Sequence, residues 1–417
     1  MHHLTASSLL AALALVSHVS GSPCTSRPRS IKHIELGPRP YYLVNNMTDG
    51  PLKFKLDSCK DKTMKPSTFS IGHRGGACLQ FPEHSKESTM AGARMGAGVL
   101  ECDVTFTRDR QLVCRHSQCD LHTTTNIVNI PDLNAKCTKP FTPATDGKPA
   151  SAKCCTSDIT LAEYKTLCAK MDAFNASATT PKDFLAGTPA WRTDLYATCG
   201  TLVDLKEHIA MVEALGLHHT PELKAPEVPM PFDGNFTHDM FAQQMIDAYK
   251  HAGVPASRVM AQSFEFESLR YWLKHEPAFG ETAILLDESA DKGNMIEAVG
   301  NLERYASEGI KTMAPPMHYL VEVGRNSTMV PSSYANKAKE LGLRLITWSL
   351  ERSGPLALVH EKGDYYYKSI QDIVTKDGDM YNYVDVLARQ VGVVGMFSDW
   401  SATVTYYANC FGLQLMR

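Results

Sequence analysis

The 417-residue sequence has no apolar run long enough to cross a membrane and no excess of basic residues. A transmembrane helix needs roughly 18 or more consecutive apolar residues, so we expect no integral membrane segment. The 42 Lys and Arg residues are balanced by 45 Asp and Glu residues, which gives a formal net charge of -3. This balance argues against the basic surface with which proteins bind nucleic acid, so nucleic acid is not an expected partner.

The cysteines also lack the Cys-x2-Cys pairs that are typical of zinc sites. The chain has 12 cysteines, an even number, and all of them follow the N-terminal segment. Seven lie within one third of the chain: Cys114, Cys119, Cys137, Cys154, Cys155, Cys168 and Cys199. We therefore predict structural disulfides formed in an oxidising compartment, although the sequence does not reveal their pairing.

The N-terminal segment resembles a secretory signal peptide, which we place at residues 1–22. Its apolar stretch runs from Leu9 to Val16, which is too short to span a bilayer, and small residues follow at 20–22. Asn-X-Ser/Thr sequons begin at Asn46, Asn175, Asn235 and Asn326. Together with the cysteines, these features predict a secreted, extracellular glycoprotein.

From residue 69 onward, short β-rich runs alternate with helical patterns. In residues 237–253, for example, Phe241, Met245 and Tyr249 recur at helical spacing and Gly253 provides a helix stop. The eight candidate strands are residues 69–74, 99–107, 218–224, 258–264, 281–287, 310–316, 343–350 and 393–400. Because strand-helix alternation implies a parallel sheet, we predict the α/β class and a closed (β/α)8 barrel of the TIM type.

Two segments depart from this alternation. Residues 118–200, rich in Thr, Pro, Lys and Cys, carry only local helical signals, and we interpret them as a cysteine-rich insertion on one barrel loop. Residues 23–68, which contain a Pro-rich stretch at 37–42, form a predicted N-terminal extension. The barrel domain is therefore expected to span residues 69–417.

The strand VLECDVTFT, at residues 99–107, places two carboxylates on one face. Side chains alternate along a strand, so Glu101 and Asp103 point the same way. The same two-residue spacing puts Glu222 and Lys224 on one face of the next strand. Buried carboxylates need a compensating charge, and three hard oxygen donors suit one divalent cation, Mg²⁺ or Ca²⁺.

An alternative interpretation needs no metal. In it, Glu222 and Lys224 form an ordinary ion pair at the end of the barrel, and Glu101 and Asp103 lie at a solvated strand end.

Two histidines are also expected at strand ends. His73 and Arg74 end the run FSIGHR, and His116 ends another short β run that follows the carboxylate strand. The carboxyl ends of the strands form the active-site face of a (β/α)8 barrel. The two histidines, Arg74 and the carboxylates are thus predicted to converge there.

The order and spacing of these motifs resemble the glycerophosphodiester phosphodiesterase family. The motifs, between about residues 69 and 400, are GHRGG with PEHSKES, GAGVLECDVTFTRDRQLVCRHSQCDLHTTT, TPELK, AQSF, ITWSL and GMFSDW. The cysteine-rich insertion resembles secreted fungal members. The resemblance implies a barrel enzyme that hydrolyses a small-molecule glycerophosphodiester to glycerol 3-phosphate and an alcohol such as choline or ethanolamine.

The resemblance also implies a role for each motif residue. Glu101, Asp103 and Glu222 take the places of the metal ligands. His73 and His116 take the catalytic acid/base places, Arg74 the phosphate-binding place and Lys224 a charge-stabilising one, so that both cations bind the substrate phosphate.

The chain departs from the family pattern after His116, where Ser117 stands in place of the usual Asp. A carboxylate next to a histidine orients its ring and raises its basicity. We expect Asp120 or a backbone carbonyl to replace that function, or the activity to be lower.

Three further residues are candidates for the pocket. Glu83, in the PEH triplet, is either an orienting residue behind the site or a surface residue. Phe264 and Trp348 lie at strand ends, where they either line the alcohol pocket or belong to the core.

Two other functions remain open at this point. One is a phospholipase D-like activity on lysophospholipid or sphingomyelin, since toxins of that kind resemble this barrel and its metal site. The other is a non-catalytic secreted barrel protein, for which Ser117 is the single hint in the motifs.

Overall fold

The computed structural model describes residues 31–415 of the chain. The predicted signal peptide and Cys24 lie outside these residues. No helix in the described range is long and apolar enough to cross a membrane.

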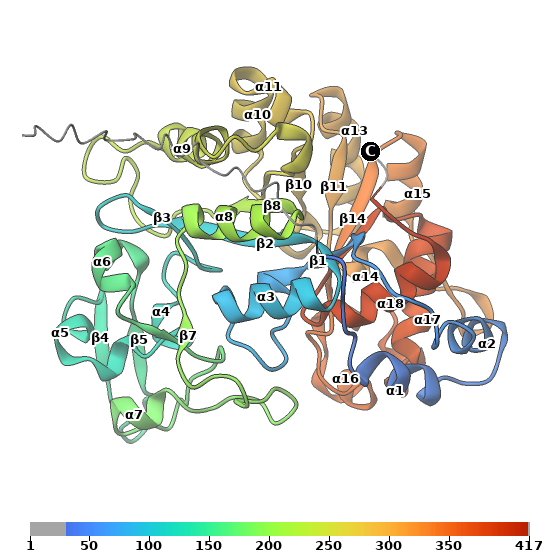
Figure 1. Ribbon diagram of the computed structural model, residues 1–417, viewed down its shortest axis with the longest axis horizontal. Coiled ribbons are helices and arrows are strands. Elements are labelled where there is room, and N and C mark those ends of the chain that lie inside the picture. The colour runs from blue at the N-terminus through green and yellow to red at the C-terminus, as the bar shows by residue number, and fades with distance from the viewer. Residues whose placement is uncertain (1–30, 416–417) are drawn as a thin grey trace, which may run out of the picture.

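Eight parallel strands form the centre of the molecule (Figure 1). They are β1 (Ser67–Gly72), β2 (Ala97–Phe106), β8 (His218–Leu223), β9 (Gln262–Ser263), β10 (Ile284–Leu286), β11 (Thr312–Ala314), β14 (Arg344–Leu350) and β15 (Gly395–Ser398). The strand β1 pairs with β2 on one side and with β15 on the other, so the sheet closes on itself. The predicted (β/α)8 barrel is confirmed, and each strand overlaps a predicted run.

Helices connect the strands and cover the outside of the barrel. The longer ones are α3 (Lys86–Arg94), α8 (Leu205–Leu215), α9 (His238–His251), α10 (Phe266–His275), α13 (Met295–Ser307), α15 (Ser333–Glu340), α17 (Asp379–Asp385) and α18 (Ser401–Phe411). The helix α9 shows why they form: its side chains Phe241, Met245 and Tyr249 are buried, and the Thr237 side chain caps its first turn.

Because side chains alternate along each barrel strand, the two faces of the strands belong to two separate hydrophobic cores. Val99, Ile284 and Phe397 are among the residues that fill the inside of the barrel. The alternate residues of β2, such as Cys102 and Val104, face the larger core between barrel and helices. Because β2 is buried along its whole length, the carboxylates that share the face of Val99 lie inside the barrel.

The inserted segment begins after β3 (Leu112–Cys114), which pairs antiparallel with β2, and ends near β7 (Gly200–Thr201). Figure 1 shows it to one side of the barrel, around the short elements α5 (Pro131–Asn134), β4 (Lys139–Thr142), β5 (Ser151–Lys153) and α6 (Leu161–Tyr164). It has a small core of its own and contains the disulfides Cys119–Cys155, Cys137–Cys154 and Cys168–Cys199.

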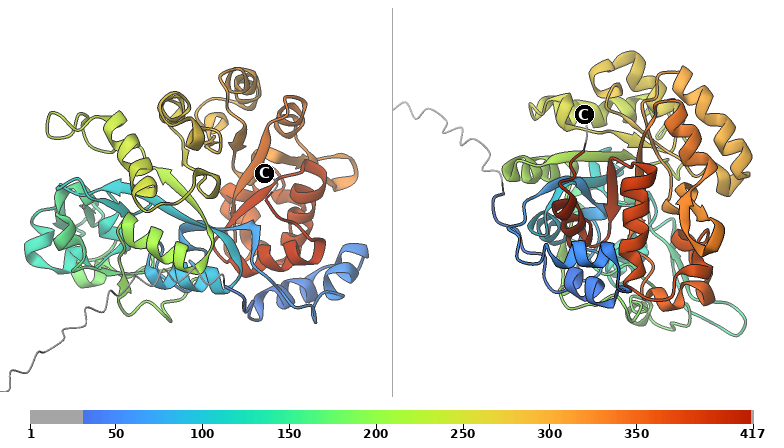
Figure 2. Two further views of the ribbon diagram at one scale, coloured as in Figure 1. Left: turned by 45° about the horizontal axis from the view of Figure 1, so that its top comes forward. Right: turned by 90° about the vertical axis from the view of Figure 1, so that its right-hand side faces the viewer.

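The N-terminal extension contains α1 (Arg39–Asn46) and α2 (Pro51–Asp57), which pack beside α18 (Figure 2). The hydroxyl of Tyr406 donates a 2.7 Å hydrogen bond to the carbonyl of Leu56. The disulfide Cys59–Cys410 closes a connection across 351 residues. The extension is thus attached to the last helix of the barrel.

Candidate active site

His73 follows directly after β1 and is held by groups from the last two barrel strands. Its Nδ1 lies 2.5 Å from Oδ1 of Asp399 and 2.8 Å from Oγ of Ser349. The other oxygen of Asp399 accepts a 2.8 Å hydrogen bond from Arg352. Since an ionised carboxylate only accepts, the Nδ1 proton of His73 points to Asp399 and the Nε2 lone pair remains available.

The pKa values of this pair follow from burial and charge. Burial lowers the pKa of His73 to about 4, even though Asp399 favours its protonated form. Burial alone would raise the pKa of Asp399, but the cation of Arg352 and the contact with His73 hold it below its ordinary value. At neutral pH the pair is therefore a neutral imidazole hydrogen-bonded to a carboxylate.

Arg74 stands where the chain turns sharply away from β1. Its backbone is left-handed, with φ 51°, and Gly75 and Gly76 follow at positive φ. A Cβ on Gly75 would lie only 2.5 Å from Oγ of Ser88, so this turn needs glycine. The guanidinium of Arg74 donates a 2.9 Å hydrogen bond to Glu83, which is buried. Glu83 is thus a buried orienting residue behind the site.

The three predicted carboxylates form one cluster. Oxygens of Glu101, Asp103 and Glu222 lie within 4.8 Å of one another. These side chains are only 3%, 1% and 5% exposed, so the solvated strand end of the alternative interpretation is wrong. Its ion pair does exist, because Nζ of Lys224 lies 2.7 Å from Glu222.

Burial and mutual repulsion raise the pKa values of two carboxyl groups in the cluster. Burial and the charges of Asp103 and Glu222 raise the pKa of Glu101 well above its ordinary value. Burial, together with Asp103, raises the pKa of Glu222 to about 8 despite Lys224. Two of the three carboxyls therefore resist ionisation unless a further positive charge is supplied.

A divalent cation fits this cluster. Oδ1 of Asp103 is buried and has no hydrogen-bond partner among the described residues, although its Oδ2 lies 2.8 Å from Nε2 of His84. Glu101 is held by the backbone N–H of Arg74 and by Gln262, at 2.7 and 2.9 Å. Three oriented oxygen donors with an unpaired oxygen are the ligands that Mg²⁺ or Ca²⁺ takes.

His116 lines the same cavity as His73. It lies two residues beyond Cys114, which is joined by a disulfide to Cys102, the residue between two of the carboxylates. No hydrogen bond to its ring occurs among the described residues, in contrast to His73. Burial and the charges of Arg74 and Lys224 lower its pKa well below the ordinary value.

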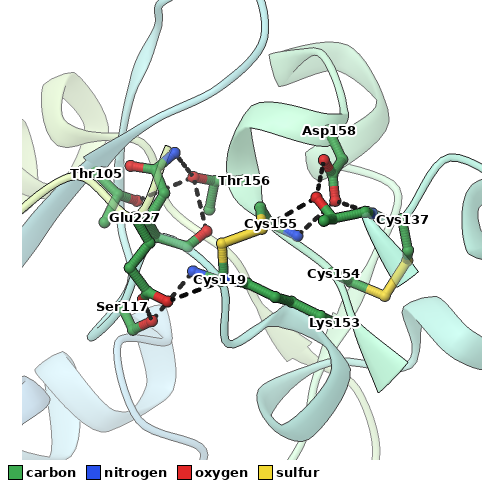
Figure 3. The surroundings of a disulfide bond; sticks show 12 residues. Thr105, Ser117, Cys119, Cys137, Lys153, Cys154, Cys155, Thr156, Asp158 and Glu227 are labelled. Atoms are coloured by element: carbon green, nitrogen blue, oxygen red, sulfur yellow. Dashed lines mark hydrogen bonds and ion pairs between the residues drawn. A yellow bond between two sulfur atoms is a disulfide. The ribbon is translucent and has the colours of Figure 1, made fainter. Parts of the chain in front are cut away.

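The Asp expected after His116 is not replaced by Asp120. The carboxylate of Asp120 accepts a 3.0 Å hydrogen bond from the N–H of Ser117. The hydroxyl of Ser117 donates to Glu227 (Figure 3). Two residues after Ser117 comes Cys119, whose disulfide to Cys155 is drawn in the same figure. The loop after His116 is thus fixed by its own contacts, without a carboxylate on the imidazole ring.

These groups line a cavity of about 600 Å³. Its lining includes His73, Arg74, Glu101, His116, Glu222 and Lys224, together with Phe264 and Trp348. Glu83 and Asp103 lie behind this lining. The structure therefore brings all ten predicted site residues into one region, with the two aromatic residues on the cavity wall.

Four residues near the site were not anticipated from the sequence. Asp399 and Ser349 both contact His73. Arg352 pairs with Asp399 and also lies 3.7 Å from Glu83. His84 contacts Asp103. Asp399 lies within the GMFSDW motif, which is a signal that was available. Asp399 contacts His73 because the barrel closes between β1 and β15, and the motif alone does not reveal this closure.

A comparison with protein families matches residues 73–403 to the glycerophosphoryl diester phosphodiesterase family. A protein of Arthroderma benhamiae described as "Extracellular protein" is 47% identical over 245 residues, which cover 58% of this chain and all of that protein.

Among solved structures, one from Silicibacter pomeroyi DSS-3, described as "Putative glycerophosphoryl diester phosphodiesterase", superposes with a TM-score of 0.55 at 17% identity. The match covers 87% of this chain and 99% of that one, and it confirms the fold.

We predict that divalent cations stabilise the protein through the carboxylate cluster. A cation that binds the folded state alone adds about 2.7 kcal/mol at a concentration of about 100 times its Kd. Tm, measured with Ca²⁺, Mg²⁺ or chelator, should rise with the preferred cation. Glu101→Gln should abolish the rise, while Glu267→Gln, on the exposed face of α10, should keep it. An equal rise in both variants would contradict a cation at this cluster.

Proposed function

The chain belongs to the glycerophosphoryl diester phosphodiesterase family, whose members hydrolyse glycerophosphodiesters, and from this premise we propose how it does so. One divalent cation is held by Glu101, Asp103 and Glu222, and His73 and His116 transfer the protons. The products are glycerol 3-phosphate and an alcohol. The observation that carries the proposal is that two histidines, Arg74 and two carboxylates line one cavity, with the third carboxylate of the cluster behind them.

The phosphate is bound by fixed positive charge. In-line attack adds negative charge to the equatorial oxygens of the phosphodiester, so cations aimed at those oxygens stabilise the transition state. The guanidinium of Arg74 is oriented by Glu83, and the ammonium of Lys224 by Glu222. A divalent cation held by Glu101, Asp103 and Glu222 would add Lewis-acid stabilisation.

His73 acts as the general base in this proposal. Its Nδ1 proton is held by Asp399, and its neutral ring presents Nε2 to the cavity. The contact stabilises the imidazolium that forms when Nε2 takes a proton from the nucleophile. The nucleophile is the 2-hydroxyl of the glycerol moiety or a water molecule.

His116 acts as the general acid. Without a carboxylate partner and beside the charges of Arg74 and Lys224, its imidazolium is a strong acid. The negative phosphate of the substrate favours its protonation, and it then gives that proton to the departing alkoxide. The missing Asp after His116 suits this role, because a carboxylate would weaken the acid.

The protein acts outside the cell in this proposal. Its relative in Arthroderma benhamiae is named extracellular, and the described residues contain five disulfides. Disulfides persist in oxidising compartments and are rare in the cytosol. The predicted signal peptide at residues 1–22 agrees with this location.

We predict that the purified protein releases glycerol 3-phosphate and choline from glycerophosphocholine. The reaction should require Ca²⁺ or Mg²⁺, stop with chelator and be lost in His73→Ala, because the base is then missing. Product analysis by enzyme-coupled assay or NMR measures this outcome. Lysophosphatidylcholine serves as the comparison substrate. If the protein cleaves it but does not cleave glycerophosphocholine, a phospholipase D-like enzyme is favoured. If the folded protein cleaves neither substrate, a non-catalytic barrel is favoured.

We predict that substrates with different leaving groups distinguish the roles of the two histidines. His116→Gln should lower kcat/KM for glycerophosphocholine by about 10²- to 10⁴-fold, the usual contribution of a general acid. The same variant should lose far less on glycerophospho-p-nitrophenol, whose leaving group needs no proton. His73→Gln should lose activity on both substrates. Equal losses of His116→Gln on the two substrates would assign it another role.

The low pKa of His73 predicts activity in mildly acidic solution. A base must be neutral, and the pKa of His73 is about 4, whereas an ordinary histidine has a pKa of about 6.5. As the pH falls, kcat/KM for the aryl diester should therefore hold through pH 5.5 and decline only below about pH 5. A decline centred near pH 6.5, with the fold intact by circular dichroism, would show that another group is the base.

A further inference from the structure

The cavity has a second half that phosphate chemistry does not explain. Trp348, Tyr365 and Tyr366 line it together with Phe264. The ring of Trp348 lies 6.1 Å from that of Tyr365 and 6.2 Å from that of Tyr366, and Phe264 stands edge-on to Trp348 at 5.8 Å. These half-buried rings form one continuous surface, which we call the aromatic wall.

Carboxylates surround this wall. Glu227, Glu265, Glu288 and Asp291 line the outer part of the cavity, where Lys292 is the one cation among the lining residues. Three of these carboxylates are already paired: Glu288 with Lys292 at 2.7 Å, Asp291 with Lys368 at 2.5 Å and Glu227 with Lys153 at 3.7 Å. Glu265 has no ion pair among the described residues. The outer part therefore carries net negative charge, although a phosphodiester substrate is an anion.

The wall already attracts cations of the protein itself. Nζ of Lys224 lies 5.8 Å from the centre of the Phe264 ring, and Nζ of Lys368 lies 4.9 Å from that of Tyr365. The face of an aromatic ring attracts a cation, and tryptophan does so most strongly. The ring of Trp348 has no such cation over it among the described residues.

The two halves of the cavity thus differ in charge. Arg74 and Lys224 provide positive charge at the phosphate end, whereas aromatic faces and carboxylates provide negative potential beyond Phe264 and Trp348. A substrate with a phosphate at one end and a cation at the other would match both halves. A neutral polyol head group would find few hydrogen-bond partners on the aromatic wall.

We propose that the aromatic wall and Glu265 form a subsite that selects glycerophosphodiesters with a quaternary ammonium head group. This inference rests on the proposed function, since it concerns the leaving alcohol of the same reaction. The rings of Trp348 and Tyr366 contact the ammonium methyl groups, and the carboxylate of Glu265 provides long-range attraction at the open side.

The test compares two substrates of the same shape. One is glycerophosphocholine, and the other is its neutral isostere, the glycerophosphodiester of 3,3-dimethylbutanol, in which carbon replaces the ammonium nitrogen. The wild-type protein should show about tenfold higher kcat/KM for the cationic substrate, in the range of a partly desolvated cation–π contact. A purely apolar pocket would accept the isostere equally well or better.

Variants locate the preference within the cavity. Trp348→Leu should reduce the ratio of the two kcat/KM values toward one, whereas Trp348→Phe, which also lacks the indole N–H but keeps a ring, should retain most of it. Glu265→Gln should lower the ratio about twofold, and Glu267→Gln, which lies outside the cavity, should leave it unchanged. Use of the ratio cancels any general loss of activity in a variant.

The outcomes separate this inference from the proposed function. Hydrolysis of both substrates at equal kcat/KM, or faster hydrolysis of the isostere, would overturn the subsite and leave the phosphodiesterase intact. A ratio that is unaffected by Trp348→Leu would also overturn it. If neither substrate nor glycerophosphoglycerol is hydrolysed with any divalent cation, the proposed function itself fails.

Discussion

The repulsion among three buried carboxylates is the constraint on which the rest of the site depends. Glu101, Asp103 and Glu222 are brought together by neighbouring strands inside a barrel, where water cannot screen them. An unpaired buried charge costs several kcal/mol, so such a cluster persists only with compensating positive charge. Lys224 and Arg74 supply part of it, and in the function proposed above a divalent cation would supply the remainder.

His73 and Arg74 owe their orientation to residues distant in the sequence. Asp399 from the last strand holds His73 after the first, and Arg352 connects Asp399 to Glu83, which in turn holds Arg74. The closure of the barrel makes these contacts possible, because β1 pairs directly with β15. His73 and Arg74 are therefore positioned by one network of buried ion pairs.

The second histidine is fixed by covalent means instead. The disulfide Cys102–Cys114 ties the short strand that leads to His116 onto the carboxylate strand, and Cys119–Cys155 holds the loop that follows. The inserted segment has only a small core, so disulfides provide stability that burial cannot. This arrangement leaves the ring of His116 free of a carboxylate, which distinguishes its chemistry from that of His73.

The sequence alone determined the barrel and which residues gather at its cavity, because strand periodicity and motif order depend on neighbouring residues in the chain. It placed Glu101 and Asp103 on one face and predicted that both histidines lie at strand ends. Only the tertiary structure decided which groups touch: that Asp399 holds His73, and that Tyr366 stands beside Trp348 in the cavity. These contacts join segments separated by whole strand-helix units or lie on loops without periodicity, so no local pattern encodes them.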